Sequence, residues 1–74
     1  MRRYKNIARD SGVTAFEIGN DYIKVKFRGP EIYIYNYINP GRERVEIMKS
    51  LALKGRGLST FISQEVRDDY YSKS

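Results

Sequence analysis

The sequence has no cysteine, no histidine and no tryptophan among its 74 residues. Without cysteine there is no disulfide and no thiolate nucleophile, and without cysteine or histidine the usual zinc ligands are missing. A domain of this size buries only about 60% of its unfolded surface, so its core gives only marginal stability without disulfides or a structural metal. We therefore expect no metal and no cofactor, and we consider self-association as a source of stability.

Long hydrophobic runs are also lacking. No apolar segment approaches the roughly 20 residues that a membrane-spanning helix needs. The basic start MRRYKNIARD has no hydrophobic stretch behind it, so it does not have the pattern of a secretory signal. These absences predict a soluble, cytoplasmic protein with no membrane partner, and the lack of cysteine is compatible with a reducing compartment.

The residue patterns that support catalysis are missing as well. General acid–base chemistry usually relies on histidine or on paired, buried carboxylates. The acidic residues mostly fall in expected turns or on solvated helix faces, and the serines have no histidine to activate them. Segment 55–60, GRGLST, has two glycines and a charge but lacks the full glycine spacing and the lysine of a nucleotide-binding loop. We interpret it as a helix stop followed by a cap, and we expect no catalytic residue and no enzyme.

The formal net charge is +5, and its placement along the chain is uneven. Residues 1–9 contain four basic side chains and no acid, whereas residues 10–74 contain ten basic and nine acidic ones. We expect residues 1–11 to form a flexible basic arm and residues 12–74 to form a single domain. Such an arm either contacts nucleic acid or only keeps the chain soluble.

Three segments alternate between apolar and polar side chains, as strands do: residues 13–18, 22–28 and 31–38. They are separated by the turn clusters Gly19-Asn20-Asp21 and Gly29-Pro30. Beyond residue 38 the period becomes helical. The sequence therefore predicts an α+β fold, in which a three-stranded antiparallel β-meander is followed by two α-helices packed on one face of the sheet.

The two predicted helices have recognisable ends. Asn39 can cap the first helix, and Pro40 suits its first position, where no N–H is needed. Gly55 stands where a left-handed helix stop is expected, and Ser59 suits the cap of the second helix. The apolar stripes expected to face the sheet are Val45, Met48, Leu51 and Ala52 in the first helix and Leu58, Ile62, Val66 and Tyr70 in the second.

The stretch EIYIYNY, residues 31–37, is bulky on both faces, so its pairing register decides which face is buried. A two-residue Gly29-Pro30 loop pairs Val25 with Ile34 and exposes the tyrosines beside lysines. A loop that also includes the preceding arginine pairs Val25 with Tyr33 and turns the tyrosines inward. Pro30 suits neither of the tightest hairpin turns, which need positive φ, and this favours the longer loop.

The runs GNDYIKVKFRGPEIYIYNY and VEIMKSLALKGRGLSTFIS together resemble the KTSC domain, a module named for its occurrence at the C-terminus of some lysyl-tRNA synthetases. The resemblance covers about residues 12–71. Its Tyr-x-Tyr hallmark matches Tyr33 and Tyr35, and its late Gly-x-Gly-Leu matches Gly55, Gly57 and Leu58. The resemblance implies that these motif residues are structural and that the tyrosine face is the inward one, although Ile34 stands where the family usually has a polar residue.

The resemblance also suggests RNA as a ligand, because of the synthetase context. Together with the basic charge, it leads to the expectation of a small, non-enzymatic module that binds RNA or another nucleic acid through a basic and aromatic surface. The residues expected to form that surface are Arg2, Arg3, Lys5, Arg9, Lys24, Lys26, Arg28 and Arg56. The alternative is a protein-interaction domain or homodimer that uses Ile32 and Ile34 on the uncovered face of the sheet.

Overall fold

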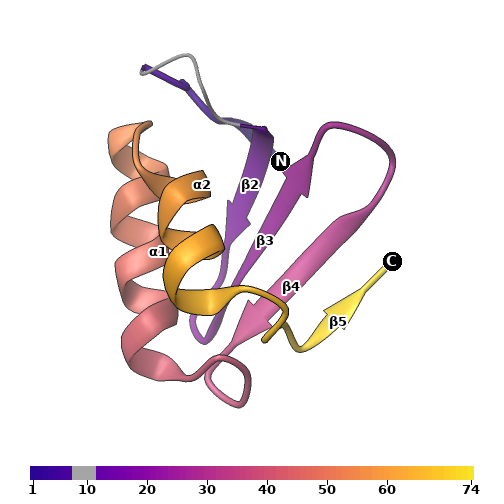
Figure 1. The fold of residues 1–74 in the computed structure, drawn as a ribbon, viewed down its shortest axis with the longest axis vertical. Helices are drawn as coiled ribbons and strands as arrows, with labels where there is room; N and C mark the ends of the chain where they lie inside the picture. Colours follow the sequence, from indigo (N-terminus) through magenta and orange to yellow (C-terminus); the bar gives the residue numbers. More distant parts are fainter. Residues whose placement is uncertain (8–11) are drawn as a thin grey trace.

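The computed structural model describes residues 1–7 and 12–74. A helical layer and an antiparallel sheet make up the fold, and the helices cover one face of the sheet (Figure 1). In chain order the elements are β1 (Arg2–Arg3), β2 (Val13–Ile18), β3 (Tyr22–Phe27), β4 (Ile32–Asn36), α1 (Arg42–Lys54), α2 (Leu58–Phe61), the π-helical turn η1 (Ile62–Val66) and β5 (Ser72–Lys73).

The sheet has five strands in the order β1-β2-β3-β4-β5, so the prediction of three strands was wrong while the α+β class was right. The central β2-β3-β4 meander is the predicted one. The two extra strands come from the chain ends, where β1 pairs with β2 and β5 pairs with β4. Each is only two residues long, and so short a strand has no alternation by which the sequence could reveal it.

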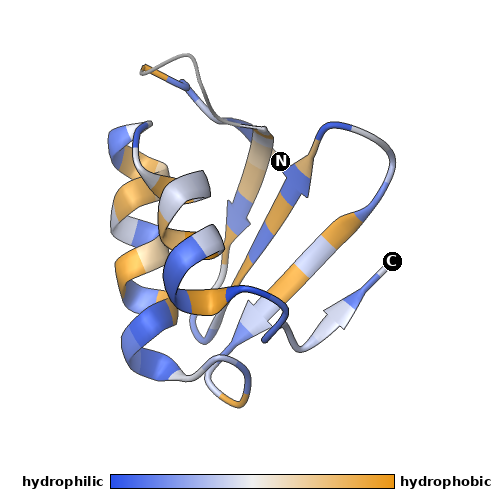
Figure 2. Cartoon of the chain, viewed as in Figure 1, coloured by the Kyte–Doolittle hydropathy of each residue, from blue (hydrophilic) through white to orange (hydrophobic). Residues whose placement is uncertain are grey.

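The register between β3 and β4 is the one predicted for the longer loop. Ile23 lies opposite Tyr35 and Val25 opposite Tyr33, while Lys24 faces Ile34 on the other side of the sheet. Gly29 in the connecting loop has φ 110°, which a residue with a side chain rarely adopts. Figure 2 shows the resulting alternation of apolar and polar residues along β3.

The core lies between the inner face of the sheet and the helices. Phe16, Ile23, Val25 and Tyr35 supply its sheet side and are almost fully buried. The predicted stripe of α1 is buried at Val45, Met48 and Ala52 and half-buried at Leu51, and the stripe that begins at Leu58 continues through Ile62 and Val66. The apolar periodicity of the sequence therefore identified most of the core, because apolar residues at this spacing lie on one face of the element and are buried together.

The ends of the helices differ in part from the predictions. Gly55 terminates α1 in the left-handed conformation, with φ 80°, as predicted. The start is different, because α1 begins at Arg42 after Gly41, and the Asn39–Pro40 peptide lies in the preceding turn in the cis form. The side chain of Asn36 accepts the backbone N–H groups of residues 38 and 39, at 3.0 Å each, and so forms the turn that displaces the expected cap.

The second predicted helix is two elements joined end to end. Gly57, and not Ser59, precedes its first residue, and α2 passes directly into the π-helical turn η1. The helical stripe is buried as far as Val66, but the helix ends there, so Tyr70 lies beyond it in the segment that leads to β5.

The N-terminal segment contacts the rest of the fold as far as residue 7, in the part of the chain where we expected a flexible arm. Tyr4 is 3% exposed, and its hydroxyl accepts the N–H of Leu58 at 3.3 Å. The N–H of Ile7 donates to the carbonyl of Gly55 at 2.7 Å. A Cβ on Gly55 would lie 2.6 Å from the Cβ of Lys5, so this glycine also makes room for the segment. Arg9 lies outside the described residues.

We predict that Tyr4→Phe lowers the free energy of unfolding by about 1–3 kcal/mol, because it leaves the first N–H of α2 buried without its acceptor. Urea denaturation followed by circular dichroism measures this loss. The matched control is Tyr71→Phe, at a residue that is 52% exposed, and it should change stability by less than about 0.5 kcal/mol. Equal, negligible effects of the two changes would mean that residues 1–7 do not belong to the fold.

Candidate nucleic-acid interface

The outer face of the sheet, opposite the helices, is a surface with two lysines at its centre. Lys24 and Lys26 alternate with the buried residues of β3 and therefore point to this face. Their cross-strand partners on β4 are the half-buried Ile34 and Ile32. On the other side, Lys26 pairs with Ala15, which pairs with Arg3 of β1, so a small residue separates two cations. Helices α1 and α2 lie on the opposite side of the sheet (Figure 1).

The two lysines differ in how strongly neighbouring acids compensate them. The Lys24 ammonium lies 3.7 Å from the carboxylate of Glu17, and the hydroxyl of Tyr22 donates to the same carboxylate at 2.9 Å. This hydrogen bond, helped by the negative charge of Glu17, raises the pKa of Tyr22 above its usual value. The Lys26 ammonium donates only to the carbonyl of Gly29, at 3.0 Å, so it has no acidic partner among the described residues.

The isoleucines predicted for self-association are placed on this outer face as expected, but they are only half-exposed. The edge of β4 that faces away from β3 is already paired, because Ile32 and Ser74 exchange backbone hydrogen bonds at 2.8 and 2.9 Å. A strand edge that is already paired offers no row of free N–H and C=O groups to a second chain. Self-association through Ile32 and Ile34 therefore stays a prediction, and it must rely on side chains alone.

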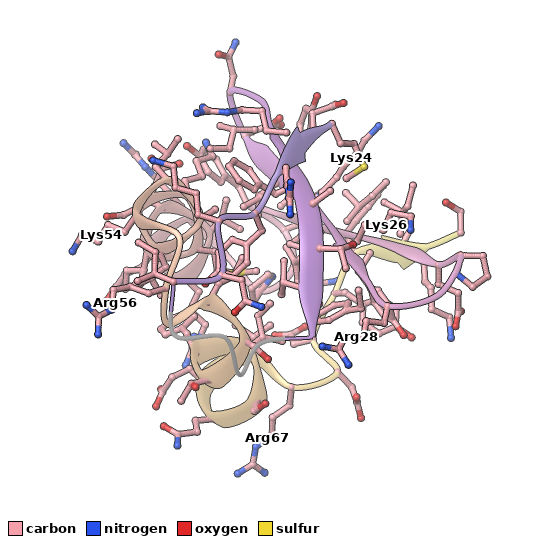
Figure 3. All side chains as sticks on the ribbon, turned by 90° about the horizontal axis from the view of Figure 1, so that it is seen from above. Lys24, Lys26, Arg28, Lys54, Arg56 and Arg67 are labelled. Carbon is pink, nitrogen blue, oxygen red and sulfur yellow. The ribbon has the colours of Figure 1, made fainter. Side chains whose placement is uncertain are left out.

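The predicted basic residues do not form one patch. In Figure 3, Lys24 and Lys26 lie on one side of the molecule, and Lys54 and Arg56 lie on the opposite side. Lys5 belongs with the second group, because its side chain contacts Gly55. Arg28 follows the end of β3 and lies on the same side as Lys24 and Lys26 in Figure 3, and Arg2 and Arg3 form the edge strand. The structure thus brings together Lys24, Lys26, Arg28 and Arg3 but separates Lys5 and Arg56 from them.

A cavity of about 410 Å³ lies on the other side of the β3–β4 hairpin end, and sequence reasoning missed it. Its lining combines residues from β3, β4, η1 and the C-terminal segment. The polar and charged members that matter here are Arg28, Arg67, Lys73, Tyr33, Tyr35 and Tyr70, with the carboxylates of Glu31 and Asp68. No periodicity could reveal it, since residues 28, 35, 67 and 73 meet only through the C-terminal strand that the sequence pattern did not predict.

Aromatic rings form much of the cavity wall. The ring of Tyr33 packs edge to face against Phe27, at 5.4 Å between centroids, and against Tyr70 at 5.0 Å. Tyr35 lies parallel to Tyr33 at 6.4 Å and is 1% exposed. Its burial is the main cause of a strongly raised pKa, with the neighbouring tyrosines adding to the effect. Tyr33 and Tyr35 are therefore inward-facing, as predicted, and at the same time they border a cavity.

Arg67 has a backbone conformation that arginine rarely adopts. Its φ is 54° and its ψ is −122°, and the N–H of Asp69 donates to the carbonyl of Val66 at 3.0 Å. These values match the first central position of a type II′ turn, which favours glycine. An arginine in this position costs roughly 1–3 kcal/mol of backbone strain. The turn directs the chain from η1 past the cavity to β5.

Comparison of the chain with protein-family models, with curated proteins and with solved structures finds no match. The resemblance to the KTSC domain therefore stays a prediction. Within residues 1–7 and 12–74, no helix has the length and apolar character needed to cross a membrane. The same part of the chain holds no group of three or more acidic, histidine or cysteine side chains placed to bind a metal ion.

We predict that Arg67→Gly raises the free energy of unfolding by roughly 1 kcal/mol, because the strain that it removes exceeds the extra chain entropy that glycine brings to the unfolded state. Thermal denaturation measures the change. The matched control is Arg56→Gly, at an exposed arginine that lacks a positive φ, and it should lower stability by about 0.5–1 kcal/mol. Destabilisation of similar size by both changes would contradict the assignment of strain to Arg67.

Proposed function

We propose that the chain is a non-enzymatic module that binds single-stranded nucleic acid, RNA in the first place, along a basic track formed by Lys24, Lys26 and Arg28. The observation that carries the proposal is the position of this track on a sheet face that no helix of residues 1–7 and 12–74 covers (Figures 1 and 3). Lys24 and Lys26 lie two residues apart on one strand, which is roughly 7 Å. The phosphates of a nucleic-acid strand can therefore lie along β3 and meet successive cations.

The electrostatics of the basic track favour a weak, salt-sensitive mode of binding. Glu17 partly neutralises Lys24, whereas Lys26 and Arg28 form no ion pair with a described residue, and Arg3 adds a further cation across Ala15. Phosphate contacts of this kind release counterions and carry little sequence information. Tyr22 is the aromatic ring on this face, so the track itself provides little base stacking. The choice of RNA over DNA comes from the resemblance to the KTSC domain.

The alternative function, protein interaction or self-association through Ile32 and Ile34, has less support. Both side chains are half-buried, and the stems of Lys24 and Lys26 lie beside them across the β3–β4 pair. The β4 edge is already paired with β5. What favours this alternative is that two large apolar residues lie on a face that no element of the described part of the chain covers, as at interaction surfaces.

We predict that Lys24→Gln combined with Lys26→Gln weakens binding of a short single-stranded RNA and reduces the slope of log K against log salt. The slope should fall by about 0.7 for each phosphate that is no longer neutralised, or about 1.4 for the pair. Fluorescence anisotropy of a labelled oligonucleotide over a salt series measures both quantities. Circular dichroism checks that the variant is folded, and we expect it to be, because both side chains lie on the outer face of the sheet.

The matched control is Lys54→Gln combined with Arg56→Gln, which removes the same charge from the opposite side of the molecule (Figure 3). It should leave the salt slope unchanged within error. Equal losses for the two double variants would show that only the net charge matters and that the basic track is not the contact surface. An affinity that does not respond to salt would contradict the proposal altogether.

A further inference from the structure

Six of the seven tyrosine hydroxyls of this protein fall into two groups, and that of the exposed Tyr71 belongs to neither. Those of Tyr4, Tyr22 and Tyr37 each form a hydrogen bond within the protein. Those of Tyr33, Tyr35 and Tyr70, which line the cavity, form none with any described residue. Tyr33 and Tyr70 are half-buried, so water can serve their hydroxyls, but a residue as buried as Tyr35 usually has a hydrogen-bond partner.

Tyr35 is the most informative of the three. Its side chain is almost completely buried, at 1% exposure, yet it lines the cavity. No side-chain nitrogen or oxygen among the described residues is sealed from solvent without a hydrogen-bond partner. The hydroxyl of Tyr35 is therefore not sealed from solvent, and because Tyr35 lines the cavity its hydroxyl can donate a hydrogen bond to a ligand there.

The charges around the cavity favour an anion. Three cationic side chains line it, against the two carboxylates of Glu31 and Asp68. Lys73 is paired with Glu31 at 3.2 Å, but Arg28 and Arg67 form no ion pair with a described residue. Arginine is well suited to phosphate, since its planar fork can donate two parallel hydrogen bonds.

The remaining lining favours a planar group attached to that anion. The rings of Phe27, Tyr33 and Tyr70 pack edge to face around one another and give the cavity an aromatic wall. Bases stack on such rings with little dependence on sequence. The volume of about 410 Å³ lies within the range of about 300–1,000 Å³ typical of small-molecule sites.

We propose that this cavity binds one nucleotide, with the phosphate held by Arg28 and Arg67, the base against the tyrosine rings, and the hydroxyl of Tyr35 as a hydrogen-bond donor. The inference rests on the proposed function and deepens it. Arg28 belongs both to the basic track and to the cavity lining, and Lys26 donates to Gly29 next to it. In this proposal a strand on the outer face passes over the hairpin end and places one nucleotide in the cavity. Figure 3 shows Lys24, Lys26, Arg28 and Arg67 in that order from the top of the view to the bottom.

The test is an NMR titration of the full chain, with tyrosine rings and backbone amides observed, using uridine 5′-monophosphate, uridine and inorganic phosphate as separate probes. We expect the nucleotide to shift the rings of Tyr33, Tyr35 and Tyr70 and the amide of Arg67. Uridine and phosphate alone should each bind at least tenfold more weakly, because each can make only part of the interactions that the nucleotide makes. Equal affinity for phosphate and nucleotide would overturn the assignment of a base to the cavity.

Tyr35→Phe removes only the unpartnered hydroxyl. It should weaken nucleotide binding about three- to tenfold, as expected for the removal of one hydrogen bond, without lowering the stability of the free protein. The matched control is Tyr37→Phe, which removes a hydroxyl that donates to Glu46 at 2.7 Å away from the cavity and should leave nucleotide binding unchanged. If Tyr35→Phe binds the nucleotide as well as the original chain does, the cavity is not the site.

The proposals for the cavity and for the basic track can be refuted independently. If RNA binding depends on Lys24 and Lys26 but the nucleotide shifts no cavity residue, the further inference is wrong and the proposed function stands. If the nucleotide shifts the cavity residues but RNA binding ignores the two lysines, the basic track is wrong and the cavity is retained as a site. If neither ligand binds, both are overturned.

Discussion

The pairing of Val25 with Tyr33 and of Ile23 with Tyr35 is the constraint on which the other features depend. A shift of one residue would move every side chain of β4 to the opposite face. In the observed register the tyrosines join the core beneath the helices, and the lysines of β3 share the outer face with Ile32 and Ile34. The same register leaves Tyr33 and Tyr35 beside the C-terminal segment, where their side chains become part of the cavity wall.

The two chain ends add core packing and edge pairing to the central meander. A domain of 74 residues without disulfide or metal has a small core, and the N-terminus enlarges it by burying Tyr4 against the start of α2. The C-terminus covers the edge of β4 through hydrogen bonds between Ser74 and Ile32. Both ends therefore protect sheet edges that would otherwise be open to other chains. The turn at Arg67 makes the C-terminal pairing possible, at a cost in backbone strain.

Sequence reasoning identified the features that follow from periodicity and turn chemistry. The three long strands, the stripe of α1 and its stop at Gly55 were predicted because burial and positive φ leave visible patterns. The strands Arg2–Arg3 and Ser72–Lys73 were missed, since two charged or polar residues look the same whether they are paired or solvated. The burial of Tyr4 was missed because its neighbours in the sequence are basic and predicted an exposed segment. Arg67 was missed because its turn normally calls for glycine, and the cavity was missed because it depends on that turn.

The basic track and the cavity lie on opposite sides of the β3–β4 hairpin, and Arg28 is common to both. In our proposal the two faces of this hairpin have different tasks, with phosphates along the outer face and one nucleotide at the inner side. The cavity depends on this register, whereas Lys24 and Lys26 face outward in either register. A sheet in the slipped register would expose the tyrosines beside Lys24 and Lys26 and would have no tyrosine-lined cavity.

The most direct test of this account is a NOESY spectrum of the isotope-labelled free protein. We expect contacts between the methyl groups of Val25 and the ring of Tyr33, between Ile23 and the ring of Tyr35, and between the rings of Tyr33 and Tyr70. Contacts of Val25 with Ile34 and of Phe27 with Ile32 would instead show the slipped register, and the inward-facing tyrosines and the tyrosine-lined cavity would then be wrong.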